Sequence, residues 1–324
     1  SPSVVGSLDL RPNDATDILY LEGEKKLLLG GSSQGASLIS IYSPEYPSRT
    51  WQAGFTSVCR GTFESKMSGP YIYMASEACG LRVTAPNSSP GVDVHFDTDG
   101  NAYSVDISGN YAYVADAQAG LQIINISDVQ NMSRTGYVYT PGEARDVVVS
   151  GDYAYVADLT KGLQIIDISD PTSPNIVGSY IPEGGTSAIE VVLKDNYAYI
   201  TDYQLGVFII DITDKTAPSL VGNFYIEPSN NSSGYRDLAV EGNYAYAAKS
   251  YDGIEIWDIT DKANTTLFGT WKDNSTQYWT NAIDVGGDYI YINYGTDLVI
   301  LGRSSSSTIQ SSSGSDATLT LPDV

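Results

Sequence analysis

Residues 145–180, RDVVVSGDYAYVADLTKGLQIIDISDPTSPNIVGSY, contain the pattern that decides the fold. Four short apolar runs rich in Val, Ile and Tyr occupy residues 146–149, 153–157, 163–168 and 176–180. Turn-forming residues separate these runs, namely Gly151-Asp152, Thr160-Lys161-Gly162 and Asp170-Pro171-Thr172. Each run has the length and composition of a β-strand, and Gly and Pro suit the tight turns between them. The unit predicts a four-stranded antiparallel meander, which must stack against further copies because both of its faces are apolar.

The second strand of this unit recurs along the chain and sets its period. Its Tyr-x-Tyr core begins at Tyr71, Tyr111, Tyr153, Tyr197, Tyr244 and Tyr289. Leu27, after Lys25-Lys26, occupies the same place in a first copy. The copies lie roughly 40 to 47 residues apart, which is typical of propeller blades rather than short solenoid repeats. The spacing predicts an all-β protein, a seven-bladed β-propeller of four-stranded antiparallel blades.

Two recurring segments connect the chain with a known family. The third strands read GLQIINIS from Gly120, GLQIIDIS from Gly162 and GVFIIDIT from Gly206, and the second strands are of the YAYVAD type. These segments resemble the LVIVD-repeat β-propeller proteins, which are found largely on bacterial and archaeal cell surfaces. The resemblance extends over residues 3–302 and implies a propeller fold and an extracellular location. It carries over no catalytic residue.

The two ends of the chain predict how the ring closes. Residues 2–10 look like the fourth strands that begin at Pro174 and Pro218, whereas the seventh copy ends after its third strand near Leu301. We therefore expect the N-terminal strand to complete the last blade and leave no open edge. Residues 1–302 then form the propeller. In the alternative, a C-terminal strand completes the seventh blade and the N-terminal strand is spare.

Residues 303–324 are predicted to be a Ser-rich linker followed by a C-terminal strand. The strand pattern is the alternation of Ala317, Thr318, Leu319, Thr320 and Leu321. A strand on a flexible tether is suited to pair with an exposed sheet edge. That edge could belong to the same propeller, to a second subunit or to a different protein. Head-to-tail docking between subunits does not close on itself and would give a filament.

Composition excludes some partners and favours an exported protein. The net charge of −22 and the pI near 4.1 repel nucleic acid and anionic membrane surfaces. No apolar run is long enough to span a bilayer, and no signal-like segment precedes Ser1, so we expect any signal peptide or anchor to have been removed or to lie outside this sequence. Asn-x-Ser/Thr triplets, which suggest a secreted glycoprotein but also suit turns, begin at Asn87, Asn125, Asn131, Asn230, Asn231, Asn264 and Asn274.

The two cysteines fall in the same copy. The strand pattern places Cys59 at the start of its innermost strand and Cys79 in the turn between its second and third strands. These two points lie at the same end of the sheet, so a disulfide is geometrically reasonable. The alternative is a pair of buried free thiols.

Recurring acidic residues predict a negative face at one end of the ring. Asp146, Glu190 and Asp237 each precede their tyrosine by seven residues, Asp17 has a similar place, and Asp116, Asp158 and Asp202 end second strands. Such a mouth could concentrate Ca²⁺ or cationic ligands, or each Asp could accept backbone N–H groups in its own turn. Ser104 and Ala282 stand where other copies carry the acid, which leaves the expected ring incomplete.

A second calcium candidate is the segment Asp97-Thr98-Asp99-Gly100-Asn101. Its oxygen ligands, Asp97, Asp99 and Asn101, alternate around a Gly as in Ca²⁺ loops, although it lacks the rest of an EF-hand. Ca²⁺ is the only cofactor that the sequence suggests. Tyr278 and Trp279 do not follow the blade period, and they predict either a ligand contact or a cover for the end of the core.

No residue pattern of a known catalytic site is present. His95 is the only histidine, and the sequence has no metalloprotease motif and no phosphate-binding loop. We therefore expect a non-enzymatic extracellular structural protein that assembles with itself into a filament through a terminal strand. The alternative is a surface binding or adhesion module with an acidic, Ca²⁺- or ligand-binding propeller face.

Overall fold

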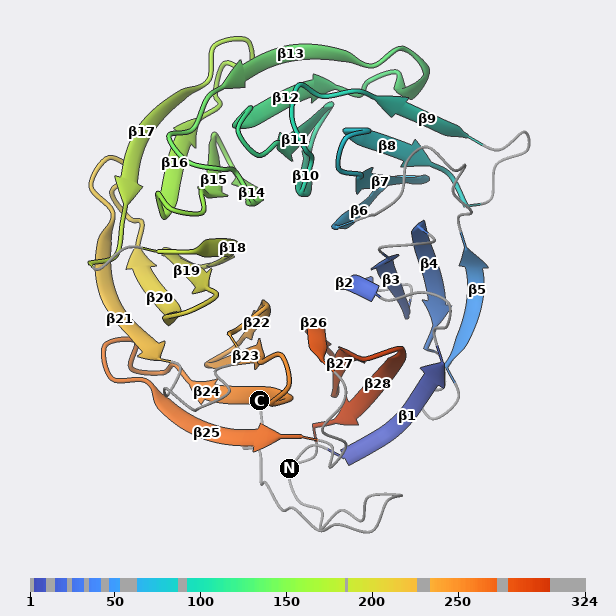
Figure 1. Cartoon of the computed structure of the whole chain (residues 1–324), viewed down its shortest axis with the longest axis vertical. Coiled ribbons are helices and arrows are strands. Elements are labelled where there is room, and N and C mark those ends of the chain that lie inside the picture. Colours follow the sequence, from blue (N-terminus) through green and yellow to red (C-terminus); the bar gives the residue numbers. More distant parts are fainter. Residues whose placement is uncertain are drawn as a thin grey trace.

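The computed structural model describes residues 3–9, 15–21, 25–31, 35–41, 47–52, 63–86, 92–183, 186–225, 234–272 and 279–303. These residues form seven four-stranded antiparallel sheets, which are arranged as blades around a central axis (Figure 1). The helical content of the described ranges is one 3₁₀ turn, Val129–Asn131. No helix in this part of the chain is long and apolar enough to cross a membrane. The predicted all-β, seven-bladed propeller is confirmed.

Each blade runs from an innermost strand at the axis to an outermost strand at the rim, and we number the blades along the chain. Blade 1 contains β2 (Ala15–Leu21), β3 (Lys26–Gly31), β4 (Gly35–Ser40) and β5 (Ser48–Gln52). Blade 2 contains β6 (Ser65–Ser68), β7 (Tyr71–Ala75), β8 (Leu81–Thr84) and β9 (Asp93–Phe96). Blade 3 contains β10 (Ser104–Ser108), β11 (Tyr111–Ala115), β12 (Leu121–Asn125) and β13 (Ser133–Val138). Blade 4 contains β14 (Asp146–Ser150), β15 (Tyr153–Ala157), β16 (Leu163–Asp167) and β17 (Asn175–Tyr180).

The remaining blades continue the same order. Blade 5 contains β18 (Ala188–Lys194), β19 (Tyr197–Asp202), β20 (Gly206–Asp211) and β21 (Ser219–Tyr225). Blade 6 contains β22 (Asp237–Glu241), β23 (Tyr244–Ala248), β24 (Ile254–Asp258) and β25 (Thr266–Trp271). Blade 7 contains β26 (Thr280–Gly286), β27 (Tyr289–Tyr294), β28 (Asp297–Gly302) and, as its outermost strand, β1 (Ser3–Asp9).

The strand β1 closes the ring. It pairs antiparallel with β28, from Ser3 opposite Gly302 to Asp9 opposite Asp297. Figure 1 shows β1 lying between the last blade and β5 of the first. The expected closure by the N-terminal strand is confirmed, and the alternative in which a C-terminal strand fills this position is wrong. Residues 304–324, including the predicted strand at 317–321, lie outside the described residues.

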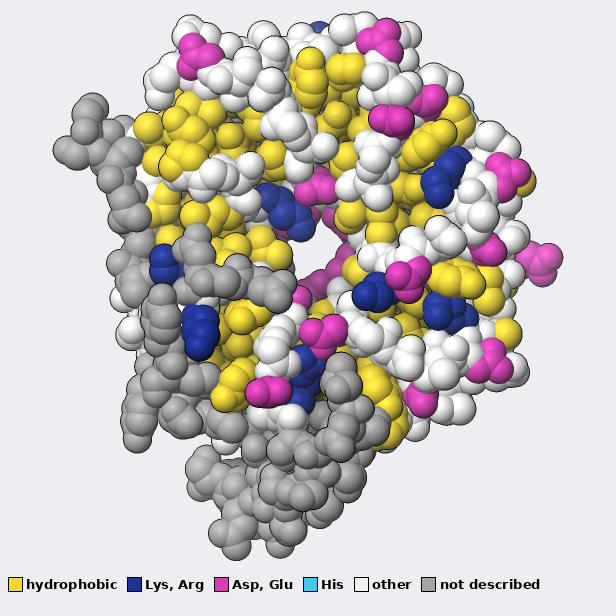
Figure 2. Space-filling model, turned by 180° about the vertical axis from the view of Figure 1, so that it is seen from behind, with side chains coloured by type: hydrophobic (Ala, Val, Ile, Leu, Met, Phe, Trp, Pro, Cys, Tyr) yellow, Lys and Arg dark blue, Asp and Glu magenta, His cyan; other side chains and the backbone are white. Residues whose placement is uncertain are grey.

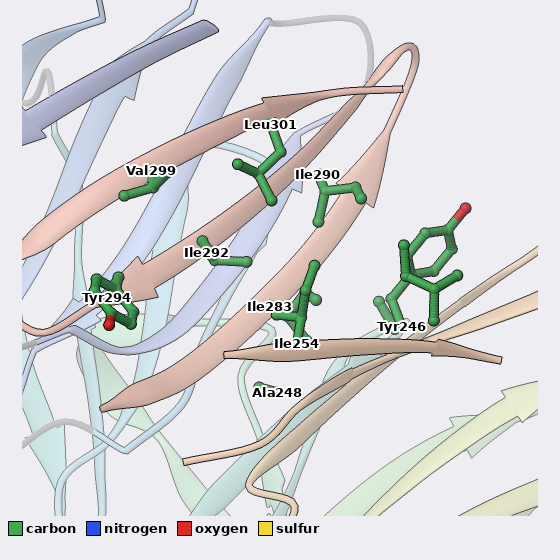
Figure 3. Packing of buried hydrophobic residues seen from close by; sticks show 11 residues of the cluster. Tyr246, Ala248, Ile254, Ile283, Ile290, Ile292, Tyr294, Val299 and Leu301 are labelled. Carbon is green, nitrogen blue, oxygen red and sulfur yellow. The ribbon is translucent and has the colours of Figure 1, made fainter. Parts of the chain in front are cut away.

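The hydrophobic core lies between adjacent blades rather than in one central cluster. The middle strands of a blade are buried on both faces because each face packs against a neighbouring blade. In the cluster between blades 6 and 7, Tyr246 and Ile254 face Ile283 and Ile290 (Figure 3). The second tyrosine of the Tyr-x-Tyr core fills this space in most blades, and it is almost fully buried at Tyr155, Tyr199, Tyr246 and Tyr291. The tyrosines therefore serve mainly as packing residues.

A recurring glycine in the outermost strands lets neighbouring blades approach closely. A Cβ atom at Gly178 would lie 2.0 Å from the carbonyl oxygen of Lys215 in the next blade. Because real Cβ atoms do not approach an oxygen so closely, this position requires Gly. The strand bulges beside it, since the register between β16 and β17 shifts at Ile165/Ile166. The repeated Val-Gly of the fourth strands is thus a packing requirement.

Candidate functional site: the central channel and its mouth

Each blade places one carboxyl group around the central axis, six from the innermost strands and one, Glu64, from the residue just before β6. The residues are Asp17, Glu64, Asp106, Asp146, Glu190, Asp237 and Asp284. Six of them line a cavity of about 570 Å³, and Asp106 is close enough for its carboxyl group to interact electrostatically with Lys66 of the same cavity. Figure 2 looks along the open channel and shows Asp and Glu side chains on its wall. We call these seven residues the acidic ring.

Sequence reasoning found four members of the acidic ring and missed three. Asp17, Asp146, Glu190 and Asp237 are brought together as expected. Glu64 was missed although it precedes Tyr71 by the same seven residues. Asp106 and Asp284 stand two residues after Ser104 and Ala282, the positions at which the ring was expected to be incomplete. Since alternate residues of a strand share a face, these two blades supply their acid one step further along the channel.

The acidic ring connects blades through backbone hydrogen bonds. Asp146 shows the arrangement: its Oδ2 accepts the N–H of Val191 in the next blade at 2.8 Å. Its Oδ1 accepts the N–H of Val147 at 2.8 Å and the hydroxyl of Ser104 at 2.6 Å. The other links between blades are Asp17 to Ser65, Asp106 to Val149, Glu190 to Leu238, Asp237 to Ile283 and Asp284 to Tyr20, at 2.6–3.1 Å. We call these contacts the carboxylate links.

Burial gives the acidic ring unusual protonation. Burial raises the pKa of Asp146 to about 7, with Glu64 adding to the shift, and raises that of Asp284 to about 6. Glu190 has a pKa well above its usual range, first because it is buried and then because the carboxyl group of Asp237 lies beside it and hydrogen-bonds to it. A carboxyl pair of this kind holds a proton between its two members.

A single lysine balances part of this charge. Lys66 forms an ion pair with Glu64 at 2.7 Å. Burial lowers the pKa of Lys66, but Glu64, Asp17 and Asp106 raise it by more, so the ammonium group stays charged. The positive charge therefore lies beside three carboxylates at the level of the ring.

The second set of predicted acids does not line the channel. Asp116, Asp158 and Asp202 are each fully buried at the end of a second strand. Asp158 accepts the hydroxyl of Thr140 at 2.6 Å and the N–H of Gly142 at 2.8 Å. Asp116 and Asp202 hold the corresponding connecting segments in the same way. The prediction that they join an acidic mouth is wrong because their carboxylates are used locally to fix the segment that enters each innermost strand.

The segment proposed for calcium has another explanation in the fold. Thr98 and Gly100 donate hydrogen bonds to Asp116, and Asp99 forms an ion pair with Arg134. Asp97, Asp99 and Asn101 are exposed. Within the described ranges, no group of three or more acidic, His or Cys side chains is arranged to hold a metal ion. Calcium binding at this segment therefore stays a prediction that the geometry does not favour.

Next to the acidic ring, the chain contributes a set of side chains at the mouth of the channel. Five of them stand one residue before an acid of the ring and line the cavity, namely Thr16, Phe63, Arg145, Ile189 and Arg236. In blade 3 the corresponding residue of the cavity is Tyr103, which stands one residue before Ser104. Arg145 lies over the ring of Tyr103, with Cζ 4.2 Å from the ring centroid, and Tyr103 packs against Phe63 at 4.9 Å between centroids. The guanidinium group of Arg145 also pairs with Glu143 at 2.9 Å. Aromatic rings on this side of the mouth therefore hold a guanidinium group in place.

Arg236 makes a second stack at the mouth, two blades further along the chain. Its Cζ lies 4.5 Å from the ring centroid of Trp279 and 5.4 Å from that of Tyr203. Tyr251 packs edge-on against Trp279 at 4.8 Å between centroids, and the Nε of Arg236 donates to Ser250 at 2.9 Å. Tyr203, Tyr251 and Trp279 remain 36%, 42% and 39% exposed. Figure 2 shows Lys and Arg side chains around the channel opening.

The structure places Trp279, a candidate from the sequence, in this second stack, while Tyr278 lies outside the described residues. The two arginines were not singled out. A repeated Arg-Asp pair at the entry of the innermost strand, Arg145-Asp146 and Arg236-Asp237, was the available signal. The aromatic partners come from other blades, so no local pattern could have shown the stacks.

The remaining predicted sites are only partly within the described residues. The innermost strand of blade 2 begins at Ser65, so Cys59 precedes this strand and does not open it as expected. Cys79 lies in the predicted turn, but Cys59 lies outside the described ranges and the disulfide stays a prediction. Of the glycosylation candidates, Asn87, Asn230, Asn231 and Asn274 also lie outside them.

The three described triplets differ in their surroundings. Asn125 is half-buried, and its Oδ1 accepts the N–H and hydroxyl of Ser127 in a turn. Asp167 makes the same turn with Ser169 in blade 4, which supports the turn explanation for Asn125. Asn131 and Asn264 are exposed, each donating from its amide group to an Asp of the same turn. Glycosylation stays a prediction at all of these sites.

With the channel and its mouth described, the class of protein is clear: a closed seven-bladed β-propeller with a cavity at its central axis. Similarity to solved structures agrees with this fold. The WD40 repeats of RRP9 align with a TM-score of 0.73 at 9% identity, over 93% of this chain and 98% of that one. The U3-55K structure gives a TM-score of 0.74 at 9% identity, over 93% and 100% of the two chains. The β-propeller domain of Cps50 (Swd1) from Myceliophteria thermophila gives 0.74 at 12% identity, over 93% and 99%.

The family follows from the repeats themselves. The LVIVD repeat matches residues 99–140, 141–181, 185–225 and 234–273, which are blades 3 to 6 with their entering segments and together make up half of the chain. The chain belongs to the LVIVD-repeat family. No curated protein matches it significantly. At the coarse level, a propeller of this family fits a surface or binding module.

Proposed function

We propose that this protein is a non-enzymatic extracellular binding module that takes its ligand at the mouth of the central channel. The observation that supports this most strongly is the pair of guanidinium groups, Arg145 and Arg236, each stacked on aromatic rings at the edge of one cavity. Binding sites typically combine a concave surface, aromatic walls and a few fixed polar groups. The cavity, about 570 Å³, has the size for a small ligand.

A binding role fits the acidic ring better than acid–base catalysis does. Carboxyl pairs that cleave glycosidic bonds need free oxygen atoms directed at the substrate. Here both oxygens of Asp146 and of Asp284 accept backbone N–H groups. These carboxyl groups are occupied by the carboxylate links, so we assign the ring to the structure of the propeller and the mouth to recognition.

An array of neutral and charged oligosaccharides and peptides, probed with the wild-type protein and with the double variant Arg145→Ala, Arg236→Ala, tests this function. We expect a subset of ligands to bind the wild type and to be lost from the double variant. Bound ligands should be recovered unaltered in mass, as a binding module requires. Signals that are equal for the two proteins, or a ligand converted into a product, would contradict the proposal.

A second candidate function is self-assembly into a filament through a C-terminal strand. It is favoured by the closure of the ring, since β1 already occupies the outer position of blade 7. The propeller therefore needs no strand from residues 304–324. The last described residue, Arg303, is fixed to the propeller by its side chain. Its guanidinium group donates to Glu241, to the hydroxyl of Tyr246 and to the carbonyl of Gly287. A segment that follows this fixed residue can pair with the outer edge of a neighbouring propeller.

Deletion of residues 304–324 tests self-assembly. The cut falls after Arg303 because removal of this residue would take away the partner of Glu241 and Tyr246. We expect the full chain to form linear assemblies in electron micrographs and light scattering, and the shortened chain to be a folded monomer. A monomeric full chain, or filaments that persist after the deletion, would refute strand donation.

A further inference from the structure

We propose that the mouth of the channel recognises a carboxylate-bearing saccharide, an inference that rests on the proposed binding function and names its ligand class. The recognition elements are the guanidinium group of Arg236 with its aromatic neighbours and, on the same cavity, Arg145 with Tyr103.

Arg236 is available to an anion. Its Nε is used by Ser250, and its ring contacts fix the plane of the guanidinium group. No acidic side chain in the described ranges forms an ion pair with it, although the protein has a net charge of −22. A planar guanidinium group with free N–H donors matches the two oxygens of a carboxylate. At Arg145, the guanidinium group lies over Tyr103 and pairs with Glu143, so Arg236 is the more open of the two guanidinium groups at the mouth.

The aromatic side chains favour a ring-shaped, amphipathic ligand. Tyr203 and Trp279 contact Arg236, and Tyr251 packs against Trp279. These three aromatic residues come from three successive blades, and each is more than one third exposed. Exposed aromatic faces bind flat apolar surfaces, and the C–H face of a pyranose ring is such a surface. The hydroxyl groups on the edge of the same ring can meet polar groups of the mouth such as Thr16. A sugar that carries a carboxylate can stack its C–H face on the aromatic rings and pair its carboxylate with the guanidinium group.

The acidic ring limits the charge of the ligand. The groups that face the mouth from all seven blades are the acids Asp17, Glu64, Asp106, Asp146, Glu190, Asp237 and Asp284, together with Lys66, Arg145 and Arg236. A singly charged carboxylate meets less repulsion from these acids than a doubly charged phosphate does. Burial holds part of the acidic ring in the neutral form, with the pKa of Asp146 raised to about 7 and that of Asp284 to about 6.

Affinity should therefore rise as the pH falls from about 8 to about 5. Asp146 and Asp284 take up protons in this range and lose their repulsion for the ligand. A sugar carboxylate stays ionised because its pKa is near that of an α-carboxyl group, about 3.5. A ligand without a carboxylate should show no such trend.

Calorimetric titration with galacturonate, which carries one carboxylate, and with its methyl ester tests the proposal directly. The two probes share the sugar ring and differ in charge. We expect the acid to bind the wild type at least tenfold more tightly than the ester. Arg236→Gln should lose at least tenfold in affinity for the acid and little for the ester. Arg134→Gln, which removes the same charge from an exposed Arg in blade 3, should bind like the wild type. Arg236→Lys keeps the positive charge but lacks the paired N–H donors of a guanidinium group. If the Gln variant does not fold, the affinities of Arg236→Lys for the acid and the ester are compared instead.

The outcomes separate this inference from the function on which it rests. Equal binding of acid and ester at the mouth would overturn recognition of the carboxylate and leave the binding function standing. If the array ligands that depend on Arg145 and Arg236 include no acidic saccharide, carboxylate recognition is likewise overturned and the binding function still stands. If no array ligand depends on these two arginines, both the inference and the proposed function are refuted. Tight binding of the acid that is unaffected in Arg236→Gln would place the site elsewhere and refute the inference.

Discussion

At the scale of single residues, Asp146 shows how one side chain serves two blades. Its two oxygens accept N–H groups from Val147 of its own strand and Val191 of the next blade. Burial raises its pKa to about 7, from an ordinary value of 3.8. The folded state therefore holds a proton that the unfolded chain releases between about pH 4 and pH 7. The resulting contribution to the free energy of unfolding is present in full below about pH 4 and is lost as the pH rises through 7.

Thermal unfolding of the wild type and of Asp146→Asn tests this contribution. The wild type should melt at a higher temperature at about pH 5 than at about pH 8, because Asp146 and Asp284 both lose protons in between. In Asp146→Asn the difference between the two pH values should shrink, because the amide does not titrate. The variant should also lose about 1–3 kcal/mol at about pH 5, since one of its two polar atoms cannot accept an N–H group.

Asp167→Asn is the matched control for this experiment. Asp167 lies exposed in a surface turn, where hydrogen bonds to the hydroxyl and N–H of Ser169 lower its pKa below 3.8. It stays ionised across the range from about pH 5 to pH 8, so its replacement should leave the pH dependence of melting unchanged. An unaltered pH dependence in Asp146→Asn would show that the proton resides on other members of the acidic ring.

At the scale of elements, β1 is the strand on which closure of the ring depends. Without it, blade 7 would have three strands and the edge of β28 would be exposed. Leu8 of β1 also packs against the cluster of Ile18 and Leu298, which joins blades 1 and 7. A chain that lacks residues 1–9 should therefore unfold at a lower denaturant concentration than the intact protein.

A synthetic peptide of residues 1–10 provides the test of specificity. Added to the shortened chain, it should restore the lost stability in proportion to its concentration, as expected for a ligand that binds only the folded state. The chain that lacks residues 304–324 retains all described strands and should match the full protein in the same denaturation experiment. Equal stability with and without residues 1–9 would contradict the role of β1 in closure.

Local patterns were sufficient to predict the blades, but not the contacts between them. The Tyr-x-Tyr core and the Gly-initiated third strand report burial and turn geometry within one blade, so they predicted strand order and the place of β1. The carboxylate links join residues about one repeat apart, such as Asp146 and Val191. Their partner is a backbone N–H, which every residue but Pro offers, and so no sequence signal marks it. The stack of Tyr203, Arg236 and Trp279 likewise spans three blades.

At the scale of the whole molecule, the seven blades share one structure. A specific function must therefore come from the positions at which the blades differ. The position before the acid is an Arg in blades 4 and 6, Phe63 in blade 2 and Ile189 in blade 5, while blade 3 places Tyr103 before Ser104 at the same mouth. The ring as a whole therefore presents an asymmetric mouth from nearly identical units. The repeated residues determine the fold, and the residues that differ between blades form the mouth. The repeats therefore identify the family and the fold, whereas the candidate site becomes visible only in the assembled ring.

The pairing of β1 with β28 also governs when the protein can be completed during biosynthesis. Of the described strands, β1 is translated first and its partner β28 last. The nascent protein must carry an unattached strand throughout elongation, and bringing the two ends together has an entropic cost that grows with their separation. A prematurely terminated chain retains two unsatisfied sheet edges that aggregate readily and are exposed to proteolysis. Joining the first described strand to the last thus makes a finished ring possible only after β28 has been translated.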